Sequence, residues 1–182
     1  MDLTERKLES EKLYDGKIVK LFRDVVELPN GKTALREVVR HPGGVIILPI
    51  DDAGNVHLVR QFRYAYDRAI LEIPAGKLEY GEEPLSAARR ELEEEIGAKA
   101  ESWVPLGDIW PTPGFCDEVQ HLWLARGLTF GKTNPDEDEF LEQVQMPFAQ
   151  ALAMAADGRM QDGKSVVAIL RAALLMEEEK NG

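Results

Sequence analysis

Four glutamates with the spacing of a cation site lie close together in the middle of the sequence. Glu91, Glu94 and Glu95 are three and four residues apart, so on a helix they share one face. Glu82 lies shortly before them, and Arg90 can serve as a counter-charge that holds the acids in place. Carboxylates this close repel one another, but Mg²⁺ prefers oxygen ligands and makes the arrangement favourable. The spacing therefore points to divalent-metal chemistry.

The same glutamates also fit an ordinary solvent-exposed helix. Surface helices are often rich in glutamate, and Arg89 and Arg90 would then be simple ion-pair partners. For this segment in isolation, the surface helix is the better interpretation. A wider pattern must therefore decide between the two.

The elements that position these residues follow from the surrounding sequence. Pro84 in a first turn, strong helix formers and Gly97 at the cap predict a helix over 84–96. Apolar and β-branched runs predict strands over 17–28, 33–41, 44–50, 56–62, 71–73, 103–110, 119–125 and 141–146. The turn residues 29–31 are expected to join the first two strands as a hairpin. Further helices are expected over 148–156 and 165–179. This order predicts an α/β fold with a mixed sheet between helical layers.

Length and composition limit the class of protein. The chain has 182 residues, enough for one domain, and no apolar stretch approaches the roughly 20 residues of a membrane-spanning helix. A net charge of −11 argues against nucleic acid as a partner, because backbone binding needs a basic patch. The polar N-terminal residues predict no secretory signal, and the single cysteine, Cys116, fits a reducing compartment. We therefore expect a soluble cytoplasmic protein that binds neither membrane nor nucleic acid.

The segment from Gly76 to Ala98 resembles the Nudix box. That motif reads glycine, five residues, Glu, seven residues, Arg-Glu, apolar, any, Glu-Glu, any, glycine, apolar. The positions in register are Gly76, Glu82, Arg90, Glu91, Leu92, Glu94, Glu95 and Gly97, and only Ala98 departs, being smaller than the usual residue. So many matches across one loop and helix favour the metal site over the surface helix.

Residues outside the box resemble the ADP-ribose pyrophosphatase branch of the Nudix hydrolase family. The stretches LVRQFRY at 58–64 and LEIPAG at 71–76 are similar to an arginine-rich strand and an approach to the box in that branch. Pro113, in the stretch PTPGF, matches the proline by which the branch is told from other Nudix enzymes. The resemblance covers the chain from about Lys17 onward.

The resemblance implies a fold, a division of the chain and an assembly. A Nudix-type α/β/α sandwich with a mixed β-sheet is expected over 43–182, preceded by an N-terminal β-hairpin extension within 1–42. In this family the N-terminal strands commonly cross to a second subunit. A homodimer is therefore also implied, with 1–42 as its dimer-forming part.

The resemblance further implies Mg²⁺-dependent hydrolysis of ADP-ribose, or a related ADP-sugar, to AMP and ribose 5-phosphate, with Mn²⁺ as a substitute for Mg²⁺. The implied metal ligands are Glu91 and Glu95, with Glu82, Glu94 and the carbonyl of Ala75 close behind. Glu94 and Arg90 are also implied to act in catalysis.

Other residues are implied as the base and as substrate contacts. The acidic stretch 134–142 matches a loop that carries a general base, for which Glu139 is the first candidate and Glu137 the second. Arg63 is expected to contact the diphosphate or terminal ribose, because a guanidinium matches phosphate oxygens with paired donors. The further substrate-binding candidates are Arg36, Glu37, Glu79 and Pro113.

Other functions stay open. A Nudix hydrolase for GDP-mannose, NADH or a dinucleoside polyphosphate would use the same box. A nucleotide-sugar sensor without activity would keep the fold, although no box acid is missing here. An RNA-decapping or RNA-binding Nudix protein conflicts with the charge of −11.

Overall fold

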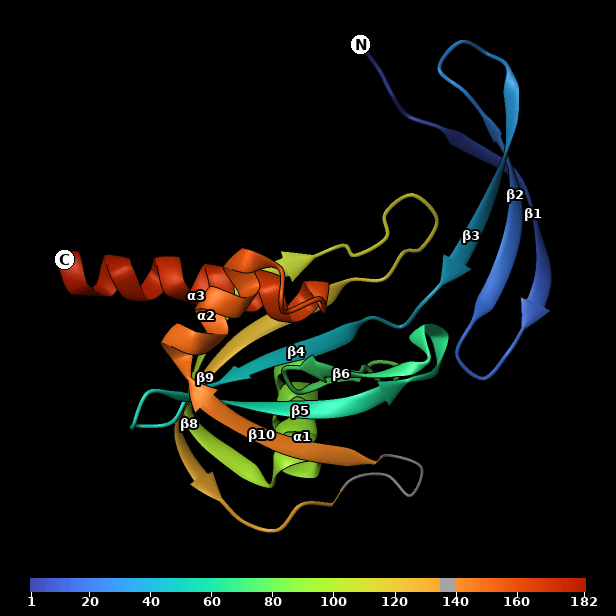
Figure 1. The fold of residues 1–182 in the computed structure, drawn as a ribbon. Helices are drawn as coiled ribbons and strands as arrows, with labels where there is room; N and C mark the ends of the chain where they lie inside the picture. The colour runs from blue at the N-terminus through green and yellow to red at the C-terminus, as the bar shows by residue number, and fades with distance from the viewer. Residues whose placement is uncertain (135–139) are drawn as a thin grey trace. The chain divides into compact units, whose positions relative to one another are not determined.

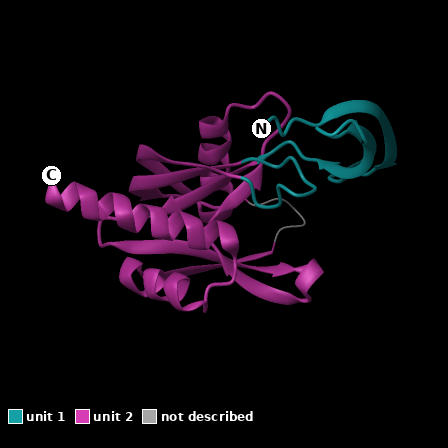
Figure 2. Cartoon of the chain, turned by 90° about the horizontal axis from the view of Figure 1, so that it is seen from above, with its two compact units in different colours: residues 1–43, 110–119 teal, residues 44–109, 120–182 magenta. Residues whose placement is uncertain are grey.

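The computed structural model describes residues 1–134 and 140–182, which form two compact units (Figure 2). The first unit contains residues 1–43 and 110–119, and the second contains residues 44–109 and 120–182. The sequence placed a boundary between residues 42 and 43. The segment 110–119, from much later in the chain, also belongs to the first unit.

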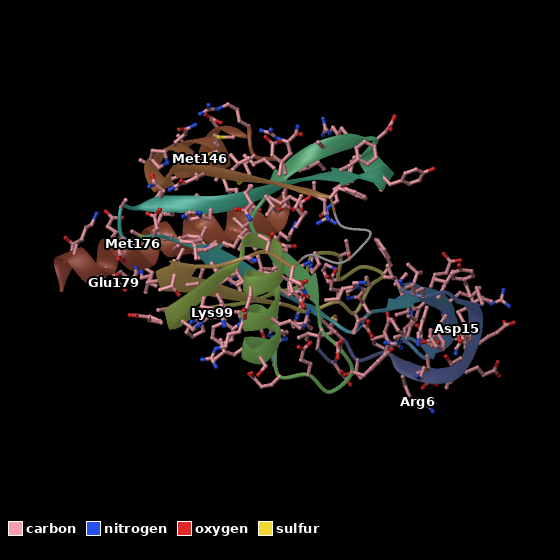
Figure 3. The ribbon with its side chains drawn as sticks, turned by 90° about the horizontal axis from the view of Figure 1, so that it is seen from below. Arg6, Asp15, Lys99, Met146, Met176 and Glu179 are labelled. Carbon is pink, nitrogen blue, oxygen red and sulfur yellow. The ribbon has the colours of Figure 1, made fainter. Side chains whose placement is uncertain are left out.

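The first unit is built on an antiparallel sheet in the order β1-β2-β3. Its strands are β1 (Arg6–Asp15), β2 (Lys20–Glu27) and β3 (Thr33–Arg40). β2 and β3 form the hairpin that the sequence predicted. β1, whose two ends are labelled in Figure 3, was not predicted. All of its residues are exposed, so pairing with β2 defines this strand, and no buried face marks it in the sequence.

The segment 110–119 is hydrogen-bonded to the end of β3. Val39 N–H donates to the Phe115 carbonyl at 2.7 Å, and Asp117 N–H donates to the Val39 carbonyl at 3.1 Å. The Asp117 carboxylate then accepts from His41 N–H at 2.8 Å and from Arg40 Nη1 at 3.0 Å. These contacts explain why the segment groups with the N-terminal strands.

The second unit contains two sheets. One is antiparallel, in the order β10-β5-β6; the other has the order β7-β4-β9-β8, in which β4 and β9 run parallel. The strands are β4 (Gly44–Pro49), β5 (Asn55–Arg63), β6 (Arg68–Glu72), β7 (Ala75–Lys77), β8 (Ala98–Ile109), β9 (Gln120–Phe130) and β10 (Leu141–Pro147), and the 3₁₀ turn η1 (Tyr64–Tyr66) joins β5 to β6. The parallel pair between antiparallel neighbours makes the mixed sheet that the sequence predicted.

Helices cover both faces of the second unit's strands (Figure 1): α1 (Pro84–Ile96) on one, α2 (Phe148–Asp157) and α3 (Gly163–Asn181) on the other. β4 shows the layering most clearly. Ile46 and Leu48 pack in one core with α2 and α3, whereas Val45 and Ile47 pack in a second core with α1. Because alternate side chains of a strand point to opposite faces, the layers are helix, strands, helix. The predicted α/β/α arrangement is confirmed.

α1 begins and ends where the sequence predicted. Pro84 lies in the first turn, and the Glu83 side chain caps the helix by accepting from Ser86 N–H at 2.9 Å. Gly97 has a φ of 66°, a left-handed conformation that glycine tolerates, and its N–H donates to the Glu93 carbonyl. Within the described residues, none of the helices has the length and apolar content needed to cross a membrane.

Candidate active site

Glu91 lies on the face of α1 that approaches Gly76. The carboxylate touches the backbone so closely that a Cβ atom at Gly76 would lie 1.8 Å from Glu91 Cδ. No other residue type fits at position 76 without moving the acid. Glu91 is 8% exposed and Glu95, one turn later, is 4% exposed. A buried carboxylate requires compensating charge or hydrogen bonds, so both acids need partners at this site.

Glu95 is linked to the short strand β7. Ala75 N–H donates to Glu95 Oε2 at 3.3 Å, although Ala75 is paired with Ile46 of β4. Along an antiparallel strand, alternate residues direct both N–H and C=O away from the partner strand. Since the Ala75 N–H points to Glu95, its carbonyl lies on that same edge. The Ala75 carbonyl and the Glu95 carboxylate, which are both implied metal ligands, therefore lie on the same side of β7.

Arg90 holds the remaining acids, and we call Arg90, Glu82, Glu91 and Glu94 the Arg90 cluster. Arg90 Nη1 donates to Glu91 Oε1 at 2.7 Å and to Glu94 Oε2 at 2.9 Å. Its Nε and Nη2 each donate to Glu82 at 3.1 Å. Glu82 also accepts from Glu79 N–H at 3.0 Å, which fixes the loop before the helix. The loop acid and the helix acids are thus brought together, as the sequence predicted.

The electrostatics of the Arg90 cluster favour an added cation. Hydrogen bonds from Arg90 lower the pKa of Glu82, and the same bonds raise the pKa of Arg90. Three carboxylates share one guanidinium, so negative charge remains in excess. That excess and the all-oxygen donor set fit a hard divalent cation such as Mg²⁺.

In the part of the chain that the structure describes, no three Asp, Glu, His or Cys side chains are already arranged as a metal site. The acids are turned toward Arg90 instead. A bound cation must therefore replace some of the contacts that Arg90 makes.

A second group of charged side chains surrounds Glu72, and we call Arg63, Glu72, Asp162 and Lys164 the Glu72 cluster. Arg63 Nε and Nη2 donate to the two Glu72 oxygens at 2.7 Å each. Lys164 pairs with Glu72 and, at 2.8 Å, with Asp162. Burial raises the pKa of Glu72, but hydrogen bonds from Arg63 and Lys164 outweigh burial and leave the pKa lowered. The Arg63 guanidinium, expected to contact the diphosphate, thus binds an acid of its own chain.

The sequence did not predict the Glu72 cluster. Lys164 lies 92 residues beyond Glu72 in the chain. Ser165 completes the link between α3 and the strands, because it bonds to Asp162 and its Oγ accepts from Ile73 N–H at 2.9 Å. No local sequence pattern indicates this contact. The LEIPAG stretch contains Glu72, but it does not indicate that Lys164 lies beside it.

The remaining predicted residues are in the first unit or outside the described residues. Arg36 and Glu37 are on β3, where Arg36 Nε donates to Glu5 at 2.9 Å and Glu37 is exposed opposite Arg23. Pro113 is exposed in the segment 110–119. Arg36, Glu37 and Pro113 belong to the first unit, whereas the acids of α1 belong to the second. The candidate bases Glu137 and Glu139 lie outside the described residues.

Two family models match this chain. The model described as NUDIX domain matches residues 40–168. The model described as nucleoside diphosphate sugar hydrolase N-terminal domain matches residues 5–39. The first match includes the whole Arg90 cluster, and the second includes β1 and most of the N-terminal sheet.

Individual proteins match over nearly the full length. The chain is 43% identical over 169 residues to a Bacillus subtilis (strain 168) protein described as ADP-ribose pyrophosphatase, covering 92% of this chain and 91% of that one. It is 43% identical over 168 residues to a Bacillus methanolicus protein described as methanol dehydrogenase activator, covering 91% and 90%. A crystal structure of an ADP compounds hydrolase matches with a TM-score of 0.86 and 23% identity over 98% of both chains, which shows the fold.

Proposed function

Because the chain belongs to the Nudix family, we propose that it is a Mg²⁺-dependent hydrolase that cleaves the diphosphate bond of ADP-ribose into AMP and ribose 5-phosphate. One observation carries the proposal. Glu82, Glu91 and Glu94 converge on the single cation Arg90, on the helix that also carries the buried Glu95. The similarity to a protein described as ADP-ribose pyrophosphatase supports the choice of substrate.

We assign the cation to the carboxylates of Glu91 and Glu95, with Glu82, Glu94 and the Ala75 carbonyl as further ligands. When bound, Mg²⁺, or Mn²⁺ in its place, neutralises the diphosphate, polarises a P–O bond and activates the attacking water. The chain itself orients the acids through the caps of α1 and the close approach at residue 76. Arg90 keeps the acids together when no cation is present.

The proton of the attacking water passes to a carboxylate, and we assign this role to Glu139, with Glu137 second. A base must come within hydrogen-bond reach of the water that it deprotonates. Replacing Glu139 with Gln preserves shape and removes the basic oxygen, so kcat should fall about a hundredfold or more. An unchanged kcat would move the role to Glu137 or to a box acid such as Glu94.

Arg63 is the substrate contact that can be tested most directly. Its Nε–H and one N–H of Nη2 are used by Glu72, so a paired phosphate contact would be made through Nη1 and the second N–H of Nη2. If Arg63 binds the diphosphate, Arg63→Lys should raise KM about tenfold, because lysine lacks the paired donors. An unchanged KM with a lowered Tm would mean that Arg63 stabilises the fold through Glu72 and does not bind the substrate. Glu79, Pro113, Arg36 and Glu37 complete the proposed substrate contacts.

We also propose a homodimer formed through the first unit. Its sheet exposes apolar side chains, including Leu8 at 42%, Tyr14 at 59% and Leu35 at 62%. Exposed apolar surface of this kind is typical of a protein interface. Light scattering should therefore give twice the chain mass of 20.4 kDa, and Leu35→Lys should shift the protein toward the monomer. The single Cys116 supports a cytoplasmic location.

A substrate panel tests the activity. Purified protein with Mg²⁺ is incubated with ADP-ribose, GDP-mannose, NADH and nucleoside triphosphates, and the products of each reaction are followed, which for ADP-ribose are AMP and ribose 5-phosphate. We expect preferential cleavage of ADP-ribose and loss of activity with EDTA. Preference for another substrate would overturn the substrate assignment and keep the Nudix reaction. If none of these substrates were hydrolysed, the result would favour a nucleotide-sugar sensor without activity.

A further inference from the structure

A pocket of about 420 Å³ opens on the second unit, lined in part by residues of β5 and β10. Its polar side chains are Asp51, His57, Gln143 and Gln145, and its apolar walls include Ile96 and Phe130. None of the acids of the Arg90 cluster lines it. Its volume falls within the range of roughly 300–1,000 Å³ that small-molecule sites occupy. We propose that this pocket binds an uncharged heteroaromatic base, such as a purine nucleoside, at a site separate from the proposed active site.

Asp51 organises the polar side of the pocket and is itself saturated. Its carboxylate accepts from Ala53 N–H at 3.0 Å and from Asn55 N–H at 2.8 Å. It also bonds to His57 Nε2 at 3.0 Å and accepts from Gln145 Nε2 at 2.9 Å. A carboxylate has about four lone-pair sites, so little acceptor capacity remains for a ligand cation. Asp51 therefore orients its neighbours and leaves the recognition of a ligand to them.

The side chains that Asp51 orients present groups suited to a base edge. Because Asp51 can only accept, His57 Nε2 carries a proton, and a neutral His57 ring then keeps its lone pair on Nδ1. The Gln143 amide nitrogen donates to the Glu95 carbonyl at 3.3 Å, and the Gln145 amide nitrogen donates to the Asp51 carboxylate. Each glutamine thus has an amide oxygen to offer as an acceptor. The exocyclic amino group of adenine and the ribose hydroxyl groups of a nucleoside are the matching donors.

The apolar side of the pocket offers a stacking surface. The rings of His57 and Phe130 lie 4.6 Å apart between centroids, and Phe130 is 52% exposed. Leu58 and Ile96, which are 0% and 3% exposed, are the buried apolar residues that line the pocket. A planar ligand can stack on the open face of Phe130, and an aromatic–base stack contributes about 1–3 kcal/mol.

The charge of the pocket selects against a nucleotide. Among the described residues that line it, none is a lysine or arginine. A phosphate group would therefore meet no cation and would face the Asp51 carboxylate. An uncharged nucleoside avoids this repulsion, so adenosine should bind more tightly than AMP.

Isothermal titration of the full chain with adenosine tests the proposal. A non-hydrolysable methylene analogue of ADP-ribose is present in excess, so that adenosine bound in the proposed active site is not counted. We expect saturable binding that weakens at least about tenfold in Phe130→Ala, through loss of the stack, and falls also in Gln145→Ala. Tyr66→Ala is the control, because it removes another exposed aromatic ring from outside the pocket. Gln143 is left intact because it bonds to the backbone of Glu95.

The outcomes separate this site from the proposed function. Hydrolysis of ADP-ribose should be unchanged in Phe130→Ala and Gln145→Ala, and thermal melts should show both variants folded. No adenosine binding up to about 1 mM would overturn the proposal, as would equal binding in wild type, Phe130→Ala and Gln145→Ala. Tighter binding of AMP than adenosine in this pocket would overturn the class of ligand.

Discussion

The two clusters of charged side chains in the second unit contain similar residues in different proportions: three acids to one cation in the Arg90 cluster, and two acids to two cations in the Glu72 cluster. In the Arg90 cluster, three carboxylates share one guanidinium. In the Glu72 cluster, one deeply buried carboxylate is held by Arg63 and Lys164 together. Burial does not separate them, because Glu91 is 8% exposed and Glu72 is 2% exposed. The balance of charge does separate them.

The difference indicates which cluster performs chemistry. The Glu72 cluster neutralises its buried acid with the chain's own cations, so Glu72 needs no added cation and can fix the strands to α3. The Arg90 cluster keeps an excess of negative charge, which a divalent cation would remove. We therefore propose that the cation site lies where the carboxylates outnumber the chain's own cations.

The largest effect should come from removing a charge on the acidic face of α1. Glu95→Gln and Glu91→Gln keep the shape of the side chain and remove one ligand charge. We expect kcat/KM for ADP-ribose to fall about a hundredfold or more in each variant. Glu93→Gln is the matched control, because Glu93 is an exposed glutamate of the same helix that pairs with Lys99. Full activity in Glu95→Gln would refute its assignment as a metal ligand.

Removing the charge of Glu72 should lower the stability of the folded protein. Glu72→Gln leaves Arg63 and Lys164 without their shared acid, and we expect a loss of about 2–3 kcal/mol in the free energy of unfolding. The estimate is below that for a fully buried pair because the Arg63 side chain is 42% exposed. Urea denaturation measures the loss.

The control for this loss is Glu142→Gln, which breaks the exposed pair with Arg60 and should cost less than about 1 kcal/mol. The Mg²⁺ concentration for half-maximal activity should be the same in Glu72→Gln and wild type. A shift in that concentration would mean that the two clusters are not separate in function.

The sequence predicted those features that depend on local interactions. α1 has its predicted bounds of 84–96 because its proline, its caps and its helix formers act within a few residues. The meeting of Glu82 with the helix acids was predicted for the same reason, since only seven residues separate Glu82 from Arg90.

Features that depend on distant pairing were missed. β1 has no buried face and is a strand through its pairing with β2, and β7 is only three residues long. Arg63 was expected at the substrate because its type suits phosphate. Nothing near Arg63 in the sequence indicates that Glu72 and Lys164 would meet at the same place.

A smaller effect on activity is expected from Gly76→Ala. The new Cβ would lie 1.8 Å from Glu91 Cδ, so the carboxylate must move away from the loop. Misplacing one ligand without removing its charge should lower kcat/KM about tenfold and raise the Mg²⁺ requirement. Gly163→Ala is the control, because a Cβ there meets no atom within 4 Å. Equal activity of the two variants would show that the close approach of Glu91 is not needed.

The smallest effect is the pH dependence of the stability that the Glu72 cluster contributes. The pKa of Glu72 is lowered below its ordinary value of 4.5, because its hydrogen bonds to Arg63 and Lys164 outweigh burial. A lowered pKa in the folded protein gives stability that is fully present above the unfolded pKa and is lost as pH falls through the folded one. The difference in the free energy of unfolding between wild type and Glu72→Gln should therefore be constant above about pH 5 and shrink below about pH 4.5. Urea denaturation at pH 7, 5, 4 and 3 measures it, with Glu142→Gln as the exposed comparison. A difference that stays constant down to the lowest pH would show that the ionised Glu72 carboxylate does not stabilise the folded chain.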